Sequence, residues 1–546
     1  MSLESPRLVL VDSLTKVTPS WQPTAPLSGL SGWQGETVSF QVAWRPQRTM
    51  PTRLRSTLRI EIDGCDQAEF FAVDLVPTQL PCFDGASEGY IATEAAMLPD
   101  VLRPLATSAP GRIQVMPNHI GWHSVWVDLP LPCSDVRLRA WVNDELLMDQ
   151  ELDVLTVPRP LEPARVSFAQ WFHSDFLAAY YGVEMWSEEL WTAIESQMVS
   201  AARMGTTALL TPVFTPPLDT AVGATRPTAQ LLDISLEDGV YRFETPRLDR
   251  WMQTLERAGI RQVELPHLFT QWGAKAAPQI HVSVDGVSRQ MFGWDTPASD
   301  PAYQEFLLQL VPFLKEYFDA RVGRENTLYH LSDEPILEHL EGYSTARTAV
   351  WESLEGCIVI DALSHPEYND LVGTPVVAND AVPAFREHGI EPSWVYYCVA
   401  QCVGVSNRFI AQDGVRTRAI GWQMYKAGAE GLLHWAFNFY ATELSSRPAN
   451  PFADTSAGGA FPGGDAFIVY PGPDFTTWES QRHRLMAGAM ADIAAAQQAE
   501  QILGRERVLR LIDPDGDLDY ADGWVTNQEW LARRRALDEA VAAVSR

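Results

Sequence analysis

Two adjacent carboxyl groups, Asp333 and Glu334, are the residues of this sequence best suited to chemistry. They follow the apolar run 327–331 and stand between Ser332 and Pro335. A strand is predicted over 327–333, so the pair lies where that strand stops. Keeping two carboxyl groups together in a folded protein costs free energy, so proton transfer explains the pair better than packing does. We therefore expect an enzyme that cleaves a bond by acid–base catalysis, with a glycosidic bond as the best candidate.

The same Asp-Glu-Pro sequence also has a structural interpretation. Acidic residues are favoured at the positive end of a helix dipole, and proline is tolerated in the first helical turn. A helix is predicted to follow over 337–356. The pair could therefore begin a helix, and this role is compatible with a catalytic one.

The adjacency of Asp333 and Glu334 favours one class of mechanism. An ordinary retaining glycosidase uses two carboxylates that face each other across the scissile bond. Successive side chains of a strand point to opposite sides, so neighbours do not meet that requirement easily. The pair suits substrate-assisted hydrolysis instead. In that scheme Glu334 protonates the leaving oxygen, and Asp333 orients a 2-acetamido group whose carbonyl oxygen is the nucleophile.

The elements that must position this pair alternate between short apolar runs and longer amphipathic segments, as in a parallel α/β sheet. The predicted strands are 166–172, 206–212, 262–267, 327–333, 357–362, 375–379, 393–398 and 431–437. The predicted helices are 187–204, 246–258, 301–320, 337–356 and 415–427. Eight strand–helix units predict a TIM-like (β/α)8 barrel, with residues 215–245 as a long loop over its mouth.

Two further regions flank the predicted barrel. Residues 1–160 contain short runs that alternate with period two between turns rich in Pro, Gly and Asp, which is typical of a β-sandwich. Residues 157–163 contain three prolines and read as a stiff linker. We expect three domains: an N-terminal β-sandwich over 1–160, the catalytic barrel over 161–490, and a C-terminal helical extension over 491–546.

A barrel carries its functional groups at the carboxyl ends of its strands, so these ends supply the candidate site. The candidates are His173, His267, Asp333, Glu334, Asp361, His365, Asn379, Asp380, Tyr396, Tyr397, Trp435 and Asn438. Acidic, amide and aromatic groups at one rim are what a sugar site requires. Three histidines, at positions 173, 330 and 365, could also bind a metal with Asp361 or Asp380. Single histidines near strand ends are more often hydrogen-bonding partners, so we predict neither a metal nor a cofactor.

The charge balance narrows the class of ligand. The chain has 41 Lys and Arg against 70 Asp and Glu, a net charge of −29. Such a surface repels nucleic acid and anionic membranes, so a small oligosaccharide or glycoside is the expected partner. No apolar run is long enough to span a membrane, and residues 1–7 carry no export signal, which predicts a cytoplasmic protein. The six scattered cysteines form no zinc-type pair and are expected to be free thiols.

Several segments in a fixed order carry a resemblance to a known family. Residues 328–335, which include Asp333 and Glu334, resemble the catalytic strand of glycoside hydrolase family 123 and the related domain of unknown function 4091. Further similar segments are 35–41, 394–398, 407–409, 416–422, 428–438, 464–472 and 480–482. The resemblance covers most of the chain and is densest from 326 to 490.

The resemblance implies a β-sandwich followed by a (β/α)8 barrel, and retaining β-N-acetylgalactosaminidase activity by the substrate-assisted route. By position, Asp333 orients the acetamido group and Glu334 is the general acid/base. Tyr396 or Tyr397 would hydrogen-bond the acetamido oxygen, and Trp435 would form an apolar floor under the sugar. Asn438 and Asp465 would bind hydroxyl groups.

Two alternatives stay open. One is a glycoside hydrolase for another sugar, either β-GlcNAc or a sugar without the acetamido group. The other is a carbohydrate-binding protein without catalysis, against which the intact acid pair argues. Many relatives are secreted, and the lack of an export signal favours imported short oligosaccharides as the substrate.

Overall fold

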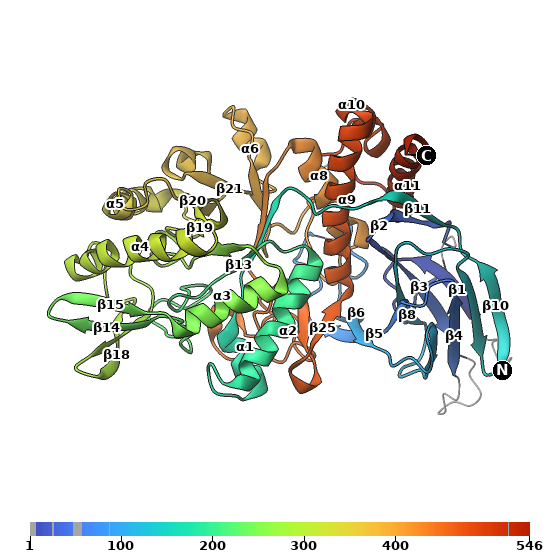
Figure 1. The fold of residues 1–546 in the computed structure, drawn as a ribbon, viewed down its shortest axis with the longest axis horizontal. Coiled ribbons are helices and arrows are strands. Elements are labelled where there is room, and N and C mark those ends of the chain that lie inside the picture. Colours follow the sequence, from blue (N-terminus) through green and yellow to red (C-terminus); the bar gives the residue numbers. More distant parts are fainter. Residues whose placement is uncertain (1–6, 24–26, 47–56, 87, 522, 546) are drawn as a thin grey trace. The chain divides into compact units, whose positions relative to one another are not determined.

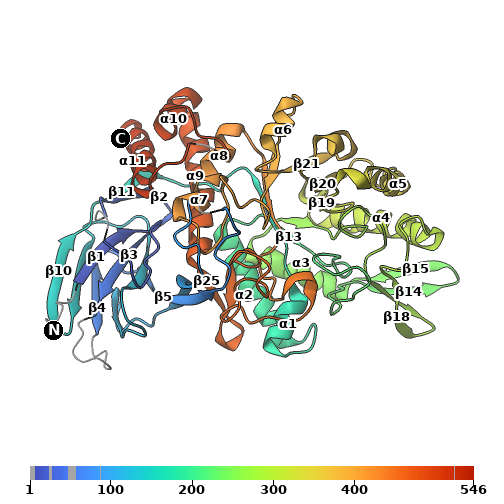
Figure 2. The same cartoon turned by 180° about the vertical axis from the view of Figure 1, so that it is seen from behind.

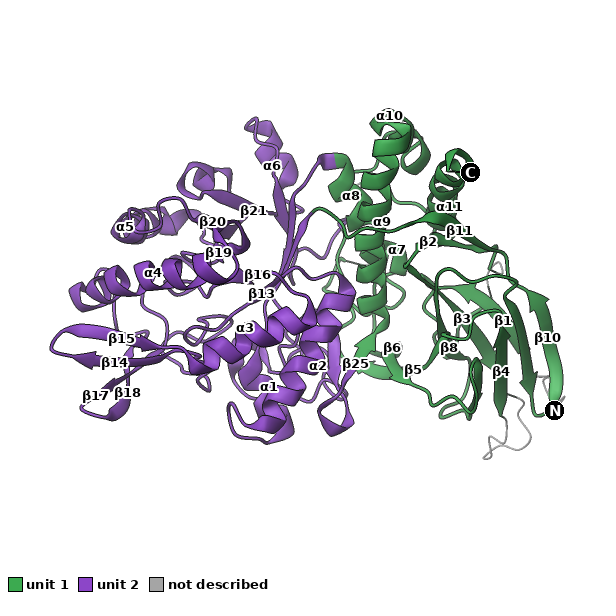
Figure 3. Ribbon diagram, viewed as in Figure 1, with its two compact units in different colours: residues 1–165, 406–426, 478–546 green, residues 166–405, 427–477 purple. Residues whose placement is uncertain are grey.

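A computed structural model of the protein describes residues 7–23, 27–46, 57–86, 88–521 and 523–545. Its chain divides into two compact units (Figure 3). Unit 1 contains residues 1–165, 406–426 and 478–546, and unit 2 contains residues 166–405 and 427–477. The prediction that residues 1–7 carry no export signal concerns mainly residues 1–6, which lie outside the described residues.

Unit 1 begins with two antiparallel sheets that form a β-sandwich. Their strands run in the orders β1-β3-β8-β5-β6-β25 and β10-β9-β4-β7. The bounds are β1 Arg7–Asp12, β3 Thr37–Arg45, β4 Leu58–Asp63, β5 Glu69–Thr78, β6 Ala96–Pro104, β7 Arg112–Val115, β8 His123–Pro130, β9 Arg137–Val142, β10 Glu145–Glu151 and β25 Thr477–Ser480. Two further strands, β2 Leu30–Gln34 and β11 Val154–Pro160, pair in parallel.

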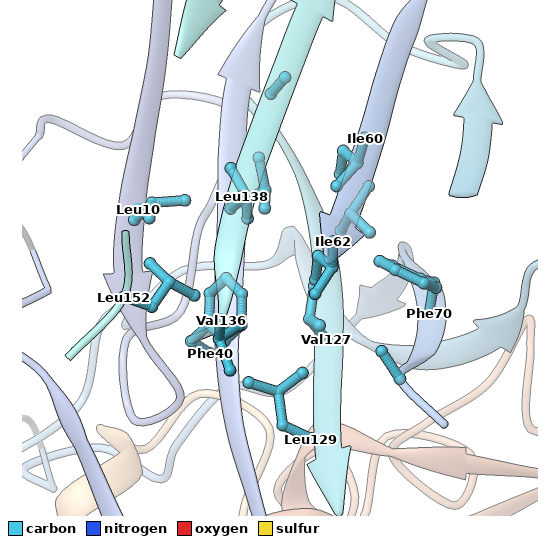
Figure 4. Close-up of a cluster of buried hydrophobic side chains, with 14 of the residues drawn as sticks. Leu10, Phe40, Ile60, Ile62, Phe70, Val127, Leu129, Val136, Leu138 and Leu152 are labelled. Atoms are coloured by element: carbon cyan, nitrogen blue, oxygen red, sulfur yellow. The ribbon is translucent and has the colours of Figure 1, made fainter. Parts of the chain in front are cut away.

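The alternating pattern of these strands produces the core between the two sheets. On β4 the side chains of Leu58, Ile60 and Ile62 are buried, while those between them are exposed or half-buried. Phe40 of β3 and Val127 of β8 join them in one apolar cluster (Figure 4). Because side chains alternate along a strand, this spacing puts Leu58, Ile60 and Ile62 together on the inner face of β4.

Unit 1 also contains the helices that follow the sandwich in the sequence. They are α7 Gly414–Arg418, α8 Ile420–Ala427, α9 Gln481–Leu503, α10 Arg505–Ile512 and α11 Asn527–Val544. Trp422 and Trp530 stack between them, with ring centroids 4.2 Å apart. A capping box formed by Thr526 and Glu529 starts α11. Among the described residues, none of the helices combines the length and the apolar character needed to cross a membrane.

Unit 2 is built on a closed barrel of eight parallel strands, which confirms the predicted fold class. The strands are β12 Ser167–Gln170, β13 Ala208–Leu210, β16 Gln262–Glu264, β19 Thr327–Tyr329, β20 Ile358–Leu363, β21 Thr374–Ala378, β22 Trp394–Tyr396 and β23 Gly431–His434. The barrel closes because β12 pairs with both β13 and β23. All eight predicted strands overlap these, but most of the real strands are shorter at their carboxyl ends.

Helices surround the barrel strands (Figure 1, Figure 2). They are α1 Ser174–Tyr181, α2 Glu188–Met204, α3 Pro246–Ala258, α4 Pro301–Arg321, α5 Leu340–Val350 and α6 Val382–Glu387. Their starts follow ordinary capping chemistry. The hydroxyl of Ser187 accepts a hydrogen bond from Leu190 N at the start of α2, and Asp300 caps α4 ahead of Pro301.

The segment 215–245, expected to be a loop, contains a β-hairpin in the structure. Strands β14 Asp233–Glu237 and β15 Val240–Glu244 pair with the second hairpin of β17 Ile280–Val284 and β18 Val287–Phe292, in the order β15-β14-β17-β18. The two hairpins turn at Asp238-Gly239 and Asp285-Gly286, where all four residues have positive φ. Two-residue turns of this kind favour Asp-Gly, so the sequence contained a signal for both hairpins.

Candidate active site

A cavity of about 340 Å³ opens at the carboxyl ends of the barrel strands. Four acidic residues line it: Asp219, Asp333, Glu334 and Glu443. Its aromatic residues are Trp171, Trp272, Tyr396, Trp435 and Phe461, and the rest of the lining is Leu218, Gln271, Ala362, Cys398, Val399, Leu433 and Leu444. Small-molecule sites are typically clefts of roughly 300–1,000 Å³ with a few polar groups on an apolar wall. This cavity therefore fits a ligand of one or two sugar rings.

Asp333 and Glu334 lie in the segment between β19 and the 3₁₀ turn Leu337–His339. The backbone N–H of Trp272 donates to the carbonyl of Asp333 (2.9 Å), and Ser332 donates its hydroxyl to the carbonyl of Thr270 (2.9 Å). These bonds attach the segment to the one that follows β16. The pair ends three residues before the first helical residue, so the expectation that it forms a helix N-terminus is wrong.

Glu334 is held by two donors from the segment of β22. The hydroxyl of Tyr396 donates to Oε1 of Glu334 at 2.7 Å, and the thiol of Cys398 lies 3.6 Å from the same oxygen. Burial raises the pKa of Glu334, while these two hydrogen bonds act in the opposite direction. A raised pKa lets a carboxyl group keep its proton to a higher pH, which suits it to donate that proton to a leaving group.

Asp333 is only 8% exposed. Burial, and then the charge of the neighbouring Glu334, hold the pKa of Asp333 well above its usual value. Two carboxyl groups this close cannot both ionise freely, so the pair tends to retain one proton.

A buried ion network lies beside the pair. His330 places Nε2 2.6 Å from Glu264 and Nδ1 3.3 Å from Asp361, and all three side chains are fully buried. The indole N–H of Trp171 donates to the same Glu264 oxygen at 2.5 Å. Burial opposes a charge on His330, but the hydrogen bonds and charges of Asp361 and Glu264 outweigh it and raise the pKa of His330 to about 9. The resulting cation lowers the pKa of Asp333 and partly offsets its burial.

His267 lies against this network, with its ring centroid 4.3 Å from that of His330. His267, His330 and Asp361 each offer one ligand atom, and these atoms lie within 4.8 Å of one another. Both ring nitrogens of His330, however, are already in contact with carboxylates. The group is therefore arranged as hydrogen-bonded ion pairs, and of the three histidines considered from the sequence only His330 belongs to it.

Unusual backbone conformations gather around the cavity. Asp219, Trp272, Glu334 and Leu444 have φ between 40° and 60°, a region that residues other than glycine seldom adopt. Each such residue costs of order 1–3 kcal/mol, and such residues cluster at functional sites. Four such residues in one cavity lining indicate that the positions of their side chains are maintained at the cost of backbone strain.

Three of the other residues proposed from the sequence occur at the cavity wall or directly behind it. Tyr396 lines the cavity, but its hydroxyl is used by Glu334. Trp435 also lines the cavity, and its indole N–H donates to Oδ2 of Asp465 at 2.9 Å. Asp465 itself is fully buried and holds Trp435 from behind.

Other proposed residues, Asn379 and Asp380 among them, also lie outside the lining. Tyr397 is buried with its ring 5.3 Å from that of His434. Asn438 is buried and links the backbone N–H of His173 (2.7 Å) to the side chain of Gln197 (2.6 Å). His173 is buried beside Arg226, and His365 is half-buried ahead of the 3₁₀ turn Pro366–Leu371.

Five polar or aromatic residues of the lining were not expected from the sequence: Asp219, Gln271, Trp272, Glu443 and Phe461. Gln271 and Trp272 lie seven and eight residues beyond the end of β16, so their place after a barrel strand was only a weak signal. Asp219 lies in the long segment after β13 and Glu443 lies well beyond β23. Neither position has a pattern that marks it in the sequence.

Comparisons with known proteins agree with this fold. Residues 171–499 match the family model described as the glycoside hydrolase 123 catalytic domain. A family 123 glycoside hydrolase from Clostridium perfringens, studied for glycolipid glycan hydrolysis, superposes with a TM-score of 0.69 at 12% identity, covering 99% of each chain. A Bacteroides ovatus GH5 xyloglucanase reaches a TM-score of 0.32 at 7% identity, covering 84% of this chain and 97% of its own. A TM-score this low does not indicate a shared fold. No curated protein matches the chain.

The matched family model spans more than half of the chain and includes seven of the eight barrel strands, the acid pair and the whole lining of the cavity. The Clostridium perfringens structure has the same fold over the full length of both chains. The protein therefore belongs to glycoside hydrolase family 123 and is a glycosidase.

Proposed function

We propose that the protein is a retaining exo-glycosidase that removes terminal β-linked N-acetylgalactosamine, with the substrate's own 2-acetamido group as the nucleophile. The observation that carries this proposal is the buried pair of adjacent carboxyl groups, Asp333 and Glu334, in one small cavity. The volume of that cavity favours an enzyme that acts on a chain end, because a longer glycan would need an open groove.

In the first step Glu334 gives its proton to the glycosidic oxygen as the bond between C1 and that oxygen breaks. The acetamido carbonyl oxygen attacks C1 and closes an oxazolinium ring. Asp333 accepts a hydrogen bond from the acetamido N–H, which orients the group and stabilises its positive charge. A pair that holds one proton supplies both needs, because the amide N–H favours the ionised form of Asp333 and leaves the proton on Glu334.

In the second step Glu334, now ionised, removes a proton from a water molecule that attacks C1. The bond between C1 and the carbonyl oxygen breaks, the acetamido group is restored, and the sugar leaves with its original anomeric configuration. Tyr396 supports both steps, since its hydroxyl holds Oε1 of Glu334 in place. Trp435 offers an apolar face to the sugar ring.

The substrate we propose is a short oligosaccharide or glycoside. The Clostridium perfringens relative has been studied for the hydrolysis of glycolipid glycans, and such a glycan end is also compatible with the cavity. Hydroxyl-binding roles for Asp465, Asn438, His173 and His365 would have to be indirect, because these residues lie outside the lining. The net charge of −29 supports a substrate other than nucleic acid.

Turnover of aryl β-GalNAc, β-GlcNAc and β-Gal tests the proposal. We expect hydrolysis of the 2-acetamido sugars only, inhibition by a thiazoline analogue, and a β-configured first product by NMR. Glu334→Gln should reduce kcat by about 10²–10⁴-fold, the usual contribution of a general acid. Glu387→Gln on α6 makes the same chemical change at an exposed site outside the cavity and should have no effect. Equal turnover of β-Gal, or unchanged activity of Asp333→Asn, would refute the substrate-assisted mechanism.

A further inference from the structure

A second group of polar side chains lies in the cavity, and the mechanism above does not use it. Asp219 follows β13, Gln271 follows β16, and Glu443 follows β23. In a closed barrel of eight strands the fourth and the eighth are opposite each other, and here these are β19 and β23. The segment of Glu443 therefore starts across the barrel from the segment of the acid pair.

Hydrogen bonds connect these three segments. Gln271 accepts the backbone N–H of Asp219 with Oε1 (2.5 Å). Oδ2 of Asp219 accepts the backbone N–H of Leu444 (2.9 Å), and the hydroxyl of Ser445 donates to the carbonyl of Asp219 (2.6 Å). Asp219, Leu444 and Ser445 all have positive φ. Asp219, Gln271 and Glu443 therefore form one hydrogen-bonded side of the cavity, which we call the wall. Its backbone conformations are energetically costly, which is typical of a functional site.

Each side chain of this wall has a polar atom left over. Because the backbone N–H of Asp219 is a donor, the side-chain oxygen of Gln271 must face it. The side-chain amide nitrogen of Gln271 then points away from this hydrogen bond. Among the described residues, neither that nitrogen nor Oδ1 of Asp219 takes part in a hydrogen bond, and the carboxylate of Glu443 has no partner either. Two acceptor groups and one donor are therefore available to a ligand in the cavity.

The wall is also strongly acidic. Its two carboxyl groups join Asp333 and Glu334, and the lining contains no Lys, Arg or His among the described residues. Burial raises the pKa of Asp219 to about 6, and the charge of Arg226 behind the lining acts in the opposite direction. Arg226 is buried, however, and already binds Asp175 through two hydrogen bonds (2.8 and 3.0 Å) and the carbonyl of Leu218 (2.8 Å). A sugar with a sulfate or carboxylate group would meet uncompensated negative charge on both sides.

We propose that Asp219, Gln271 and Glu443 form a specificity-determining wall that hydrogen-bonds the hydroxyl groups of an uncharged sugar and excludes sugars that carry an anionic substituent. This inference rests on the proposed function in that it assigns the cavity to the sugar being cleaved. It adds the class of sugar, namely one without sulfate or carboxylate, and the residues that select it. Like charges placed against each other repel, which disfavours binding of an anionic sugar relative to a neutral one.

The test compares neutral 4-nitrophenyl β-glycosides of GalNAc, GlcNAc and galactose with their 6-O-sulfated counterparts. For the neutral sugar that turns over fastest, we expect wild-type kcat/KM to exceed that of its sulfated form by at least about 100-fold. Glu443→Gln and Asp219→Asn should each reduce this ratio about tenfold, mainly through KM of the sulfated substrate. Asparagine suits position 219 because it tolerates positive φ. The matched control Glu387→Gln should leave the ratio unchanged.

The outcomes separate this inference from the proposed function. If β-Gal turns over as well as β-GalNAc, the acetamido mechanism fails, but the ratio of neutral to sulfated substrate still tests the wall. If no glycoside is hydrolysed, calorimetric titration of the free neutral and sulfated sugars replaces the kinetic ratio. Equal use or equal binding of neutral and sulfated sugars, or a ratio that Glu443→Gln and Asp219→Asn do not change, would overturn the inference. So would the absence of binding by any neutral sugar.

Discussion

The hydrogen bond from Tyr396 to Glu334 should set the pH range of the enzyme. The phenol donates to Oε1 at 2.7 Å, and such a bond stabilises the ionised carboxylate more than the protonated acid. Removing the hydroxyl in Tyr396→Phe should therefore raise the pKa of Glu334. Because the general acid must be protonated, the alkaline limb of the kcat/KM profile should move to higher pH.

The size of this move follows from the donors that remain. A hydrogen bond to a charged group contributes about 1.5–3 kcal/mol, and 1.36 kcal/mol corresponds to one pH unit. The thiol of Cys398, 3.6 Å from the same oxygen, stays in Tyr396→Phe and compensates in part. We therefore expect the lower end of the range, a displacement of about one pH unit.

The assay is kcat/KM of the aryl glycoside between pH 4 and 9 for wild type and Tyr396→Phe. Tyr317→Phe is the matched control, because Tyr317 also donates to a carboxylate, that of Asp249 (2.7 Å), but lies outside the cavity. Its alkaline limb should coincide with that of wild type. If Tyr396 instead binds the acetamido oxygen, as the family resemblance implies, kcat would fall while the limb stays in place. A limb that stays in place or moves to lower pH would refute the reasoning.

Three further predictions concern stability. His330 has a pKa raised to about 9, so its charge stabilises the fold below pH 6.5 and that contribution is lost as the pH rises to 9. The unfolding free energy of wild type, measured in urea, should fall by up to about 3 kcal/mol relative to His330→Gln over this interval, and a constant difference would contradict the ion network. The raised pKa of Asp333 means that its ionised form destabilises the folded protein. Asp333→Asn should therefore be more stable than wild type by about 1 kcal/mol at pH 7 and equally stable at pH 3.5. No gain in stability at pH 7 would argue against this effect. Thr526→Ala should destabilise unit 1 by about 1 kcal/mol through loss of the cap of α11, while Thr526→Ser keeps the cap and should not; equal losses in both would argue against capping.

The barrel could be predicted from the sequence because its strands are buried on both sides. Runs such as 358–363 and 431–434 are nearly all apolar and alternate with amphipathic helices, which is a strong and repeated pattern. The ends of the strands were the weak point. Residues 330–333 are all buried like the strand before them, although the strand ends at Tyr329 and the chain turns toward the segment after β16. Burial alone does not distinguish a strand from a buried segment that follows it.

Some residues of the candidate site could likewise be predicted from the sequence, and others could not. Asp333, Glu334, Tyr396 and Trp435 lie close to strand ends, and the position in the barrel was enough to find them. Asp219 and Glu443 were missed because long segments bring them to the cavity through bonds between backbone and side chains. Such bonds depend on local turns with positive φ at residues other than glycine, for which sequence patterns are poor guides.

The geometry of Glu334 also resolves the difficulty that two neighbouring residues pose in a strand. In extended backbone, successive side chains point to opposite sides, so one member of the pair would leave the site. The pair lies beyond the end of β19, and Glu334 has φ of 40°, which breaks the alternation and lets both carboxyl groups line one cavity. The hydrogen bond from Tyr396 then fixes the second carboxyl group in that position. The strained conformation at Glu334 therefore brings the carboxyl group of a sequence neighbour of Asp333 into the same cavity. Shortening the side chain in Glu334→Asp should lose the contact with Tyr396 even though the charge is kept.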